Sequence, residues 1–349
     1  MAFWLRTIRL NVLGEYWGED MADSMASPNS RLSPGEQDSL VGVIGATSLV
    51  GTCLLPLLSV QGRRAIAFSR QMFGSLGDGV EWRQLSLSRC HSLQTSDKAA
   101  NHSTKLFDRQ VFDYPQRDER EIAHWICLAP IWVLPEYFDL LEAQGAKRVV
   151  VLSSTSRFTK NESVDPEEQV LAHRLADGEV RVQEWAESRG VEWVILRPTL
   201  IYGLGMDKNI TEIMRFIRRF GFFPLFGRAN GLRQPIHVED VAVASLAALK
   251  STVAANHAYN ISGGETLPYR EMVSRMFDVL CRRPRFVMIP MVIFKLAVAC
   301  LRILPRYKHW SSAMAERMNH DLVFDHSDAA RDLGFSPRPF QLTPEEMPR

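Results

Sequence analysis

The sequence has few cysteines, and none are spaced as metal ligands. Its 349 residues contain no CxxC pair and no Cys/His spacing that suggests zinc, and its five cysteines lie far apart: Cys53, Cys90, Cys127, Cys281 and Cys300. Scattered cysteines of odd number are typical of free thiols in a reducing compartment. We therefore expect no metal site and a cytoplasmic protein.

An excess of charge of either sign is also missing. The chain has 41 basic and 40 acidic side chains, which gives a formal net charge of +1. Domains that bind nucleic acids usually show a basic excess or a basic stripe. We therefore expect no nucleic-acid partner.

No run of residues is apolar enough to predict a membrane span. The closest is 286–305, FVMIPMVIFKLAVACLRILP, which holds Pro290, Lys295 and Arg302. A span needs about 20 mostly apolar residues with few charges. We expect a buried or half-buried helix of a second lobe here. Peripheral contact with a membrane surface stays open, because the two basic side chains could reach out of the apolar layer.

The first 38 residues lack both a signal peptide's apolar core and the composition of a folded domain. Two arginines near the start are soon followed by four acidic residues, and 21–38 is rich in Ser, Asp, Pro and Gly. We expect residues 1–38 to be a disordered, dispensable extension.

Short apolar runs alternate with helical patterns from residue 40 onward. The strand candidates are 40–46, 64–68, 80–85, 122–128, 148–153 and 192–196, and the helix candidates are 48–60, 134–144 and 165–189. This order predicts an α/β fold, with a Rossmann doubly wound parallel sheet over residues 39–203 and ligands at the carboxyl ends of its strands. Residues 86–118 show no pattern. Residues 204–349 are expected to form a smaller mixed substrate lobe, from which 234–264 returns to the core sheet.

A glycine-containing loop, GATSLVG, follows the first strand. A strand that turns sharply into a helix directs backbone N–H groups and the positive helix end at a pyrophosphate. The expected cofactor contacts are Gly45, Thr47, Ser48, Leu49, Val50 and Gly51.

This loop resembles the GATGxxG loop of extended and atypical short-chain dehydrogenase/reductases, the NAD-dependent epimerase/dehydratase group, although Ser48 replaces the middle glycine. Four further segments resemble the family in the right order: LSST at 152–155, LRPTLIYG at 196–203, IHVED at 236–240 and YNISGG at 259–264. The resemblance covers about residues 40–340. It implies that Ser153, Pro198 and Thr199 lie by the nicotinamide and that Leu128, Ala129 and Pro130 lie on the adenosine side.

The residues after the second strand bear on the choice of cofactor. In such folds an acidic residue there holds the ribose 2′-hydroxyl of NAD, while an arginine accommodates the 2′-phosphate of NADP. This chain has Ser69 and Arg70, with no acid nearby. We expect NADP, and NAD stays open.

The family's usual acid–base pair, a tyrosine with a lysine four residues on, is missing. None of the seven tyrosines has such a lysine, and 169–189 contains neither residue type. His173 and Glu179 in that stretch are expected on a solvated helix face. By resemblance Thr155, with Ser154 beside it, is the candidate that polarises a carbonyl; capping of backbone groups is the alternative.

Arg233 is the substrate candidate, because sugar-nucleotide epimerases place a diphosphate-binding arginine at the matching position. A surface arginine is the equal alternative, and His237 and Asp240 are expected to tie the sheet to the lobe. The predicted function is an NADP-dependent oxidoreductase or epimerase-like enzyme acting on a sugar nucleotide or related carbonyl compound. The missing pair keeps a second hypothesis open, a non-catalytic NADP-binding scaffold or regulator. A homodimer also stays open.

Overall fold

The computed structural model describes residues 40–70, 79–85, 121–294 and 313–348. All of them belong to one compact unit, Leu40–Arg349. The predictions for residues 1–38, residues 86–118 and the end of the 286–305 run lie outside the described residues.

A seven-stranded sheet forms the centre of this unit. Its strand order is β11-β6-β5-β4-β1-β2-β3, and every pairing is parallel. The strands are β1 (Val41–Ile44), β2 (Ala65–Ser69), β3 (Val80–Gln84), β4 (His124–Cys127), β5 (Arg148–Leu152), β6 (Glu192–Pro198) and β11 (His257–Ile261). The predicted Rossmann fold is therefore confirmed.

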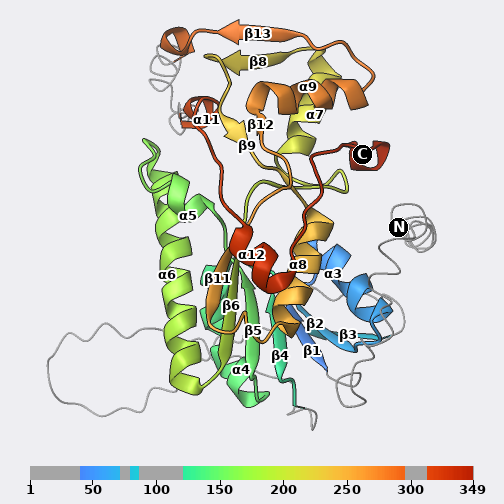
Figure 1. Cartoon of the computed structure of the whole chain (residues 1–349), viewed down its shortest axis with the longest axis vertical. Helices are drawn as coiled ribbons and strands as arrows, with labels where there is room; N and C mark the ends of the chain where they lie inside the picture. Colours follow the sequence, from blue (N-terminus) through green and yellow to red (C-terminus); the bar gives the residue numbers. More distant parts are fainter. Residues whose placement is uncertain (1–39, 71–78, 86–120, 295–312, 349) are drawn as a thin grey trace, which may run out of the picture. The chain divides into compact units, whose positions relative to one another are not determined.

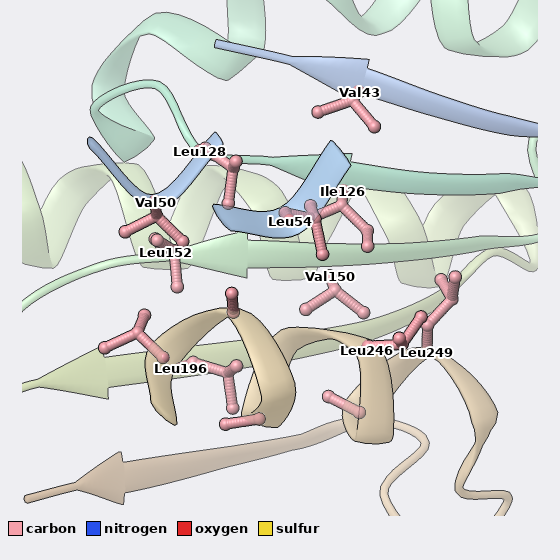
Figure 2. Packing of buried hydrophobic residues seen from close by; sticks show 14 of the residues in the cluster. Val43, Val50, Leu54, Ile126, Leu128, Val150, Leu152, Leu196, Leu246 and Leu249 are labelled. Atoms are coloured by element: carbon pink, nitrogen blue, oxygen red, sulfur yellow. The ribbon is translucent and has the colours of Figure 1, made fainter. Parts of the chain in front are cut away.

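Helices cover both faces of the sheet, which explains why its strands are almost continuously apolar. On one side lie α3 (Leu49–Val60) and α8 (Val238–Lys250), and on the other α4 (Phe138–Ala143) and α6 (Pro166–Arg189) (Figure 1). Successive strand residues alternate between the two layers. Val150 packs toward α3 and α8, whereas Val149 and Val151 pack toward α4 and α6. Figure 2 shows the first layer, with Val43, Ile126 and Val150 near Leu54 and Leu246.

The sequence marks both ends of α6. The Asp165 side chain accepts a hydrogen bond from the backbone N–H of Glu167 (3.0 Å), and Pro166 occupies the first helical position. Gly190 ends the helix in the left-handed conformation, at φ 65°. These are the expected start and stop signals of a helix.

A second, smaller cluster of buried residues forms the lobe. It includes Met214, Ile217, Leu225, Met276 and Phe277. The elements around this cluster are α7 (Ile210–Phe220), β8 (Phe223–Phe226), β9 (Leu232–Arg233), β12 (Leu267–Pro268), α9 (Tyr269–Val279), β13 (Phe286–Ile289) and α11 (Ala313–Arg317). Strand β13 runs parallel to β8, and β12 runs antiparallel to β9.

Short elements connect the sheet and the lobe or close the chain. The two-stranded pair β7 (Ile201–Tyr202) and β10 (Ile236–His237) follows β6 and precedes α8. Helix α12 (Ser327–Leu333) packs beside β11 and α8. The remaining helical turns are η1 (Ile131–Tyr137), α5 (Ser156–Thr159) and η3 (Pro344–Glu346).

The expected helix at 286–305 is wrong over its first four residues. They form β13 instead, because Phe286–Ile289 pairs with Phe223–Phe226, a partner far away in sequence that periodicity cannot reveal. Across the described residues, no helix is both long and apolar enough to cross a membrane.

Candidate functional site

The parallel register brings the carboxyl ends of the strands to one edge of the sheet. Ile44 at the end of β1 lies opposite Phe68 of β2 and Cys127 of β4. Cys127 in turn lies opposite Val151 of β5, and Leu152 opposite Leu196 of β6. The segments after these strands therefore share this edge, and they hold the predicted residues 45–51, 69–70, 128–130, 153–155 and 198–199.

The loop after β1 ends in the N-terminus of α3. The Ser48 side chain caps this helix by accepting a hydrogen bond from the backbone N–H of Gly51 (3.1 Å). The N–H of Thr52 donates to the Ser48 carbonyl. Within the described part of the chain, the backbone N–H groups of Leu49 and Val50 have no acceptor, and the first turn carries no acidic residue. Two free donors at a positive helix end suit an anionic group.

Both glycines of the loop are explained by contacts within the protein. Gly45 has φ +79°, and a Cβ there would lie 2.5 Å from the backbone nitrogen of Ala129. A Cβ on Gly51 would lie 2.2 Å from the carbonyl oxygen of Ala46. The first glycine thus lets β1 and β4 end side by side, and the second lets the loop pack on its own helix.

The ends of β2 and β4 flank this loop. Ser69 is buried and Arg70 is exposed, and the Gln84 side chain donates to the Arg70 carbonyl (3.3 Å). After β4, Leu128 is buried, Ala129 half-buried and Pro130 exposed. The Leu128 N–H donates to the Ile44 carbonyl (2.8 Å), which fixes this segment against the start of the loop.

A family model matches the part of the chain that follows β4. Residues 136–262 match the family model described as NAD dependent epimerase/dehydratase family. The matched segment is 127 of the 349 residues, so the likeness concerns this part of the chain.

Two curated relatives resemble parts of the chain. It is 32% identical over 109 residues to the mitochondrial NADH dehydrogenase (ubiquinone) 1 alpha subcomplex subunit 9 of Arabidopsis thaliana, a match that covers 31% of this chain and 27% of that protein. It is 22% identical over 203 residues to the UDP-glucose 4-epimerase of Vibrio cholerae, covering 55% and 59%. The matched segments therefore span less than two thirds of either relative.

The fold is similar to that of a solved epimerase. The structure of UDP-glucose 4-epimerase from Thermotoga maritima with UDP-glucose has a TM-score of 0.58 and 15% sequence identity. The match covers 88% of this chain and 95% of that one. At this identity the likeness concerns the fold alone.

Two of the three hydroxyls after β5 donate to protein groups. The Thr155 hydroxyl donates to the Pro198 carbonyl (3.1 Å), and the Ser153 hydroxyl donates to the Glu179 carboxylate (2.5 Å). The Ser154 oxygen accepts from the Ser156 N–H (3.1 Å), and in the described ranges its own proton has no acceptor. Of the three, Ser154 is the hydroxyl that can donate without breaking an existing bond.

Glu179 on α6 is the residue that sequence reasoning misplaced. Its side chain is only 1% exposed, so the expected solvated position is wrong; His173 is exposed. The Arg157 guanidinium donates to the Glu179 carboxylate, and Arg197 donates through Nε (3.1 Å) and Nη2 (2.6 Å). The signal was present in the spacing, because Ala172, Leu175 and Val182 predict that Glu179 lies on the same inward face.

Two arginines around one carboxylate leave this cluster with an excess positive charge. Burial, and then the nearby Arg197, lower the pKa of Arg157, and burial lowers the pKa of Arg197. Both guanidinium groups also lie over the Phe158 ring, 5.1 and 5.3 Å from its centroid. Leu175 and Leu171 lie about one and two helical turns before Glu179 on α6, and both pack in the core. Apolar side chains therefore continue the inward face on which Glu179 lies.

Arg233 is buried in the lobe and bonded to backbone carbonyls. Its guanidinium donates to the carbonyls of Leu232 (2.7 Å), His320 (2.8 Å) and Arg317, and lies over the Tyr269 ring. Burial lowers the pKa of Arg233 to about 10. The alternative of a surface arginine is therefore wrong, and the contacts with Arg317 and His320 tie β9 to the end of α11.

The segments around 199–203 and 236–240 join the sheet to the lobe and the C-terminal segment. The Thr199 side chain donates to the Gln234 carbonyl, and the Tyr202 hydroxyl donates to the Gln341 carbonyl (3.2 Å). Asp240 accepts from the Arg338 side chain (2.9 Å) and backbone N–H (3.0 Å). His237 lies 3.4 Å from the Glu346 carboxylate.

Proposed function

We propose that this chain binds a nicotinamide dinucleotide, NADP in preference to NAD, at the carboxyl edge of its sheet. We further propose that it acts as an oxidoreductase or epimerase-like enzyme on a sugar nucleotide or a related carbonyl compound. The observation that carries the proposal is the α3 N-terminus, where the N–H groups of Leu49 and Val50 lack acceptors beside the ends of β2 and β4.

The residues present fit the pyrophosphate of such a cofactor. The loop supplies free N–H donors, and the first turn of α3 carries no acidic side chain that would repel a bound anion. Thr47 is exposed and Ser48 half-buried at the same end. Ser48 replaces the glycine that usually lets the backbone approach the pyrophosphate, and its hydroxyl engages the Gly51 N–H. Leu49 and Val50 are therefore the principal donors that we propose.

Arg70 supports the choice of NADP. Its side chain is exposed after the last residue of β2, where the adenosine ribose binds in folds of this class. A guanidinium can pair with a 2′-phosphate and stack on adenine. The residues proposed around the rest of the cofactor are Ser69, Leu128, Ala129 and Pro130 on the adenosine side, and Ser153, Pro198 and Thr199 on the nicotinamide side.

The cofactor, when bound, would supply hydride chemistry, and the protein would orient the carbonyl. We assign carbonyl polarisation to Ser154, whose hydroxyl proton is uncommitted, with Thr155 holding the end of β5 against β6 through Pro198. Arg233 holds the substrate lobe together, and a substrate diphosphate would have to compete with three carbonyls for its donors.

The first test is a calorimetric titration of the full chain with NADPH and NADH, followed by a thermal-shift screen of UDP- and dTDP-sugars. We expect NADPH to bind more tightly than NADH, and at least one nucleotide sugar to raise the melting temperature further in the presence of NADP. Absence of binding by either dinucleotide would refute the cofactor assignment.

A second candidate function is a non-catalytic NADP-binding subunit. It is favoured by the absence of tyrosine and lysine from residues 169–189 of α6 and by the bonded hydroxyls of Ser153 and Thr155. The likeness to a subunit of the plant NADH dehydrogenase also supports it. Tight NADPH binding with no nucleotide-sugar response would favour this function over the enzyme.

A further inference from the structure

Exposed apolar side chains gather at one part of the lobe. Within the described residues, Val292 is 70% exposed, Ile293 58%, Phe220 51%, Met288 47% and Val287 46%. Other exposed apolar residues, such as Val60 and Val253, lie elsewhere along the chain. Four exposed apolar residues within seven positions of sequence therefore form an unusual cluster, of the kind that marks an interaction site.

These residues belong to one packed region. Strand β13, which carries Val287 and Met288, pairs with β8, the strand directly after Phe220 and the end of α7. The Arg282 side chain donates to the Ile217 carbonyl of α7 (3.0 Å). The Phe294 ring lies 4.1 Å from the Phe226 ring of β8. The end of α7, residues 282–285, β13 and residues 290–294 thus lie next to one another.

The same region is strongly basic. Segments 212–228 and 278–294 hold seven arginines and two acidic residues, whereas the whole chain has a net charge of +1. Of the two acids, Glu212 is paired with Arg215 (2.5 Å). Arg219, Arg283 and Arg285 are exposed, and no acidic partner contacts them in the part of the chain that the structure describes.

We propose that this basic apolar surface docks on a membrane that contains anionic lipids. Apolar side chains flanked by arginines are the pattern of segments that lie in a bilayer interface. The apolar side chains enter the headgroup boundary, and each arginine near an anionic leaflet adds attraction. A nucleic acid would match the arginines but would leave Val292 and Ile293 in water, so the charge and the apolar side chains together favour a lipid surface.

Vesicle flotation tests this proposal on the full chain. The probes are vesicles of phosphatidylcholine alone and of phosphatidylcholine mixed with phosphatidylglycerol. We expect the protein to float with the anionic vesicles at low salt, to bind neutral vesicles much more weakly, and to be released by high salt. Equal binding to both vesicles, or no binding, would overturn the proposal.

Two pairs of variants separate the apolar and the charged contributions. Val292→Ser with Ile293→Ser, and Arg283→Gln with Arg285→Gln, should each lower partitioning on the order of tenfold. The matched controls are Val60→Ser with Val253→Ser, and Arg174→Gln with Arg181→Gln on α6, which are also exposed and should bind like the wild type.

The oligomeric state tests whether a second copy of the chain, in place of a membrane, covers the basic apolar surface. Light scattering after size exclusion would reveal a dimer that the Val292→Ser and Ile293→Ser variant loses. Such a dimer, together with unchanged vesicle binding in that variant, would show that a second copy covers the surface and would overturn the membrane proposal.

Discussion

The two halves of the carboxyl edge of the sheet differ in what their polar groups already bind. At β1, the backbone N–H groups of Leu49 and Val50 have no acceptor in the described structure. At β5 and β6, Thr155 donates to Pro198, Ser153 donates to Glu179, and Glu179 holds two arginines. The half at β1 has free backbone donors, and it is the half to which we assign the cofactor, whereas most polar groups of the other half already bind protein groups. The two halves of one sheet edge can therefore differ in how many polar groups they leave free.

Removing the Glu179 carboxylate should have the largest effect. Glu179→Gln leaves two partly buried guanidinium groups facing each other without an anion, so we expect a loss of about 3 kcal/mol in the free energy of unfolding. Urea denaturation measures it, and Glu184→Gln, exposed on the same helix, is the control. A loss no larger than that of the control would show that this half of the edge does not depend on the cluster.

Placing a negative charge at the other half should weaken dinucleotide binding without unfolding the protein. Thr47 is exposed before the α3 N-terminus, so Thr47→Glu puts a carboxylate where we propose the pyrophosphate. We expect dinucleotide affinity to fall on the order of a hundredfold, with a stability change within about 0.5 kcal/mol. Thr47→Gln is the matched control, and equal losses in both variants would contradict a charge effect.

Catalytic variants sharpen the contrast between the hydroxyls after β5. If a substrate emerges from the screen, Ser154→Ala should lower kcat on the order of a hundredfold, because a donor to the developing oxyanion is lost. Thr155→Val should also lower the rate, through the position of Ser154, and should cost about 1 kcal/mol of stability. Tyr202→Phe should keep most activity, since its hydroxyl bonds to Gln341. An inactive but folded Tyr202→Phe variant would restore a tyrosine mechanism.

An Arg70 variant tests the proposed adenosine side of the cofactor site. Arg70→Asp should reverse the preference, with NADH binding more tightly than NADPH, because the carboxylate repels the 2′-phosphate and accepts from a 2′-hydroxyl. We expect a change of about tenfold or more in the affinity ratio. Calorimetry on both cofactors measures it, and an unchanged ratio would remove the argument for NADP.

The smallest effect is expected at the C-terminal segment. Burial raises the pKa of Glu346, but the His237 ring 3.4 Å away and the hydrogen bonds from Thr343 outweigh it, so the net pKa lies below its usual value. A lowered carboxyl pKa stabilises the fold above the unfolded pKa, and this contribution is lost as the pH falls through the folded pKa. Glu346→Gln should therefore cost about 1 kcal/mol at neutral pH. The difference from the wild type should vanish in acid, and a pH-independent difference would contradict this account.

Local patterns predict the β1 loop, the strands and the caps of α6 well, and the Glu179 cluster poorly. The β1 loop, the strands and the caps of α6 are encoded by neighbouring residues, so Gly45–Gly51 and Asp165–Gly190 can be recognised in the sequence alone. The Glu179 cluster joins β5, α5, α6 and β6, and the contacts of Arg233 join β9 to α11. Strand β13 likewise depends on β8, more than 50 residues earlier. These pairings depend on contacts between distant segments, which periodicity does not carry.

The most direct test of the central claim is NADPH titration of the wild type, Thr47→Glu and Glu184→Gln by calorimetry. The account predicts one site per chain in the wild type and in Glu184→Gln, and affinity lower on the order of a hundredfold in folded Thr47→Glu. NADPH binding that survives in Thr47→Glu at wild-type affinity would contradict it, because the cofactor would then bind away from the N-terminus of α3.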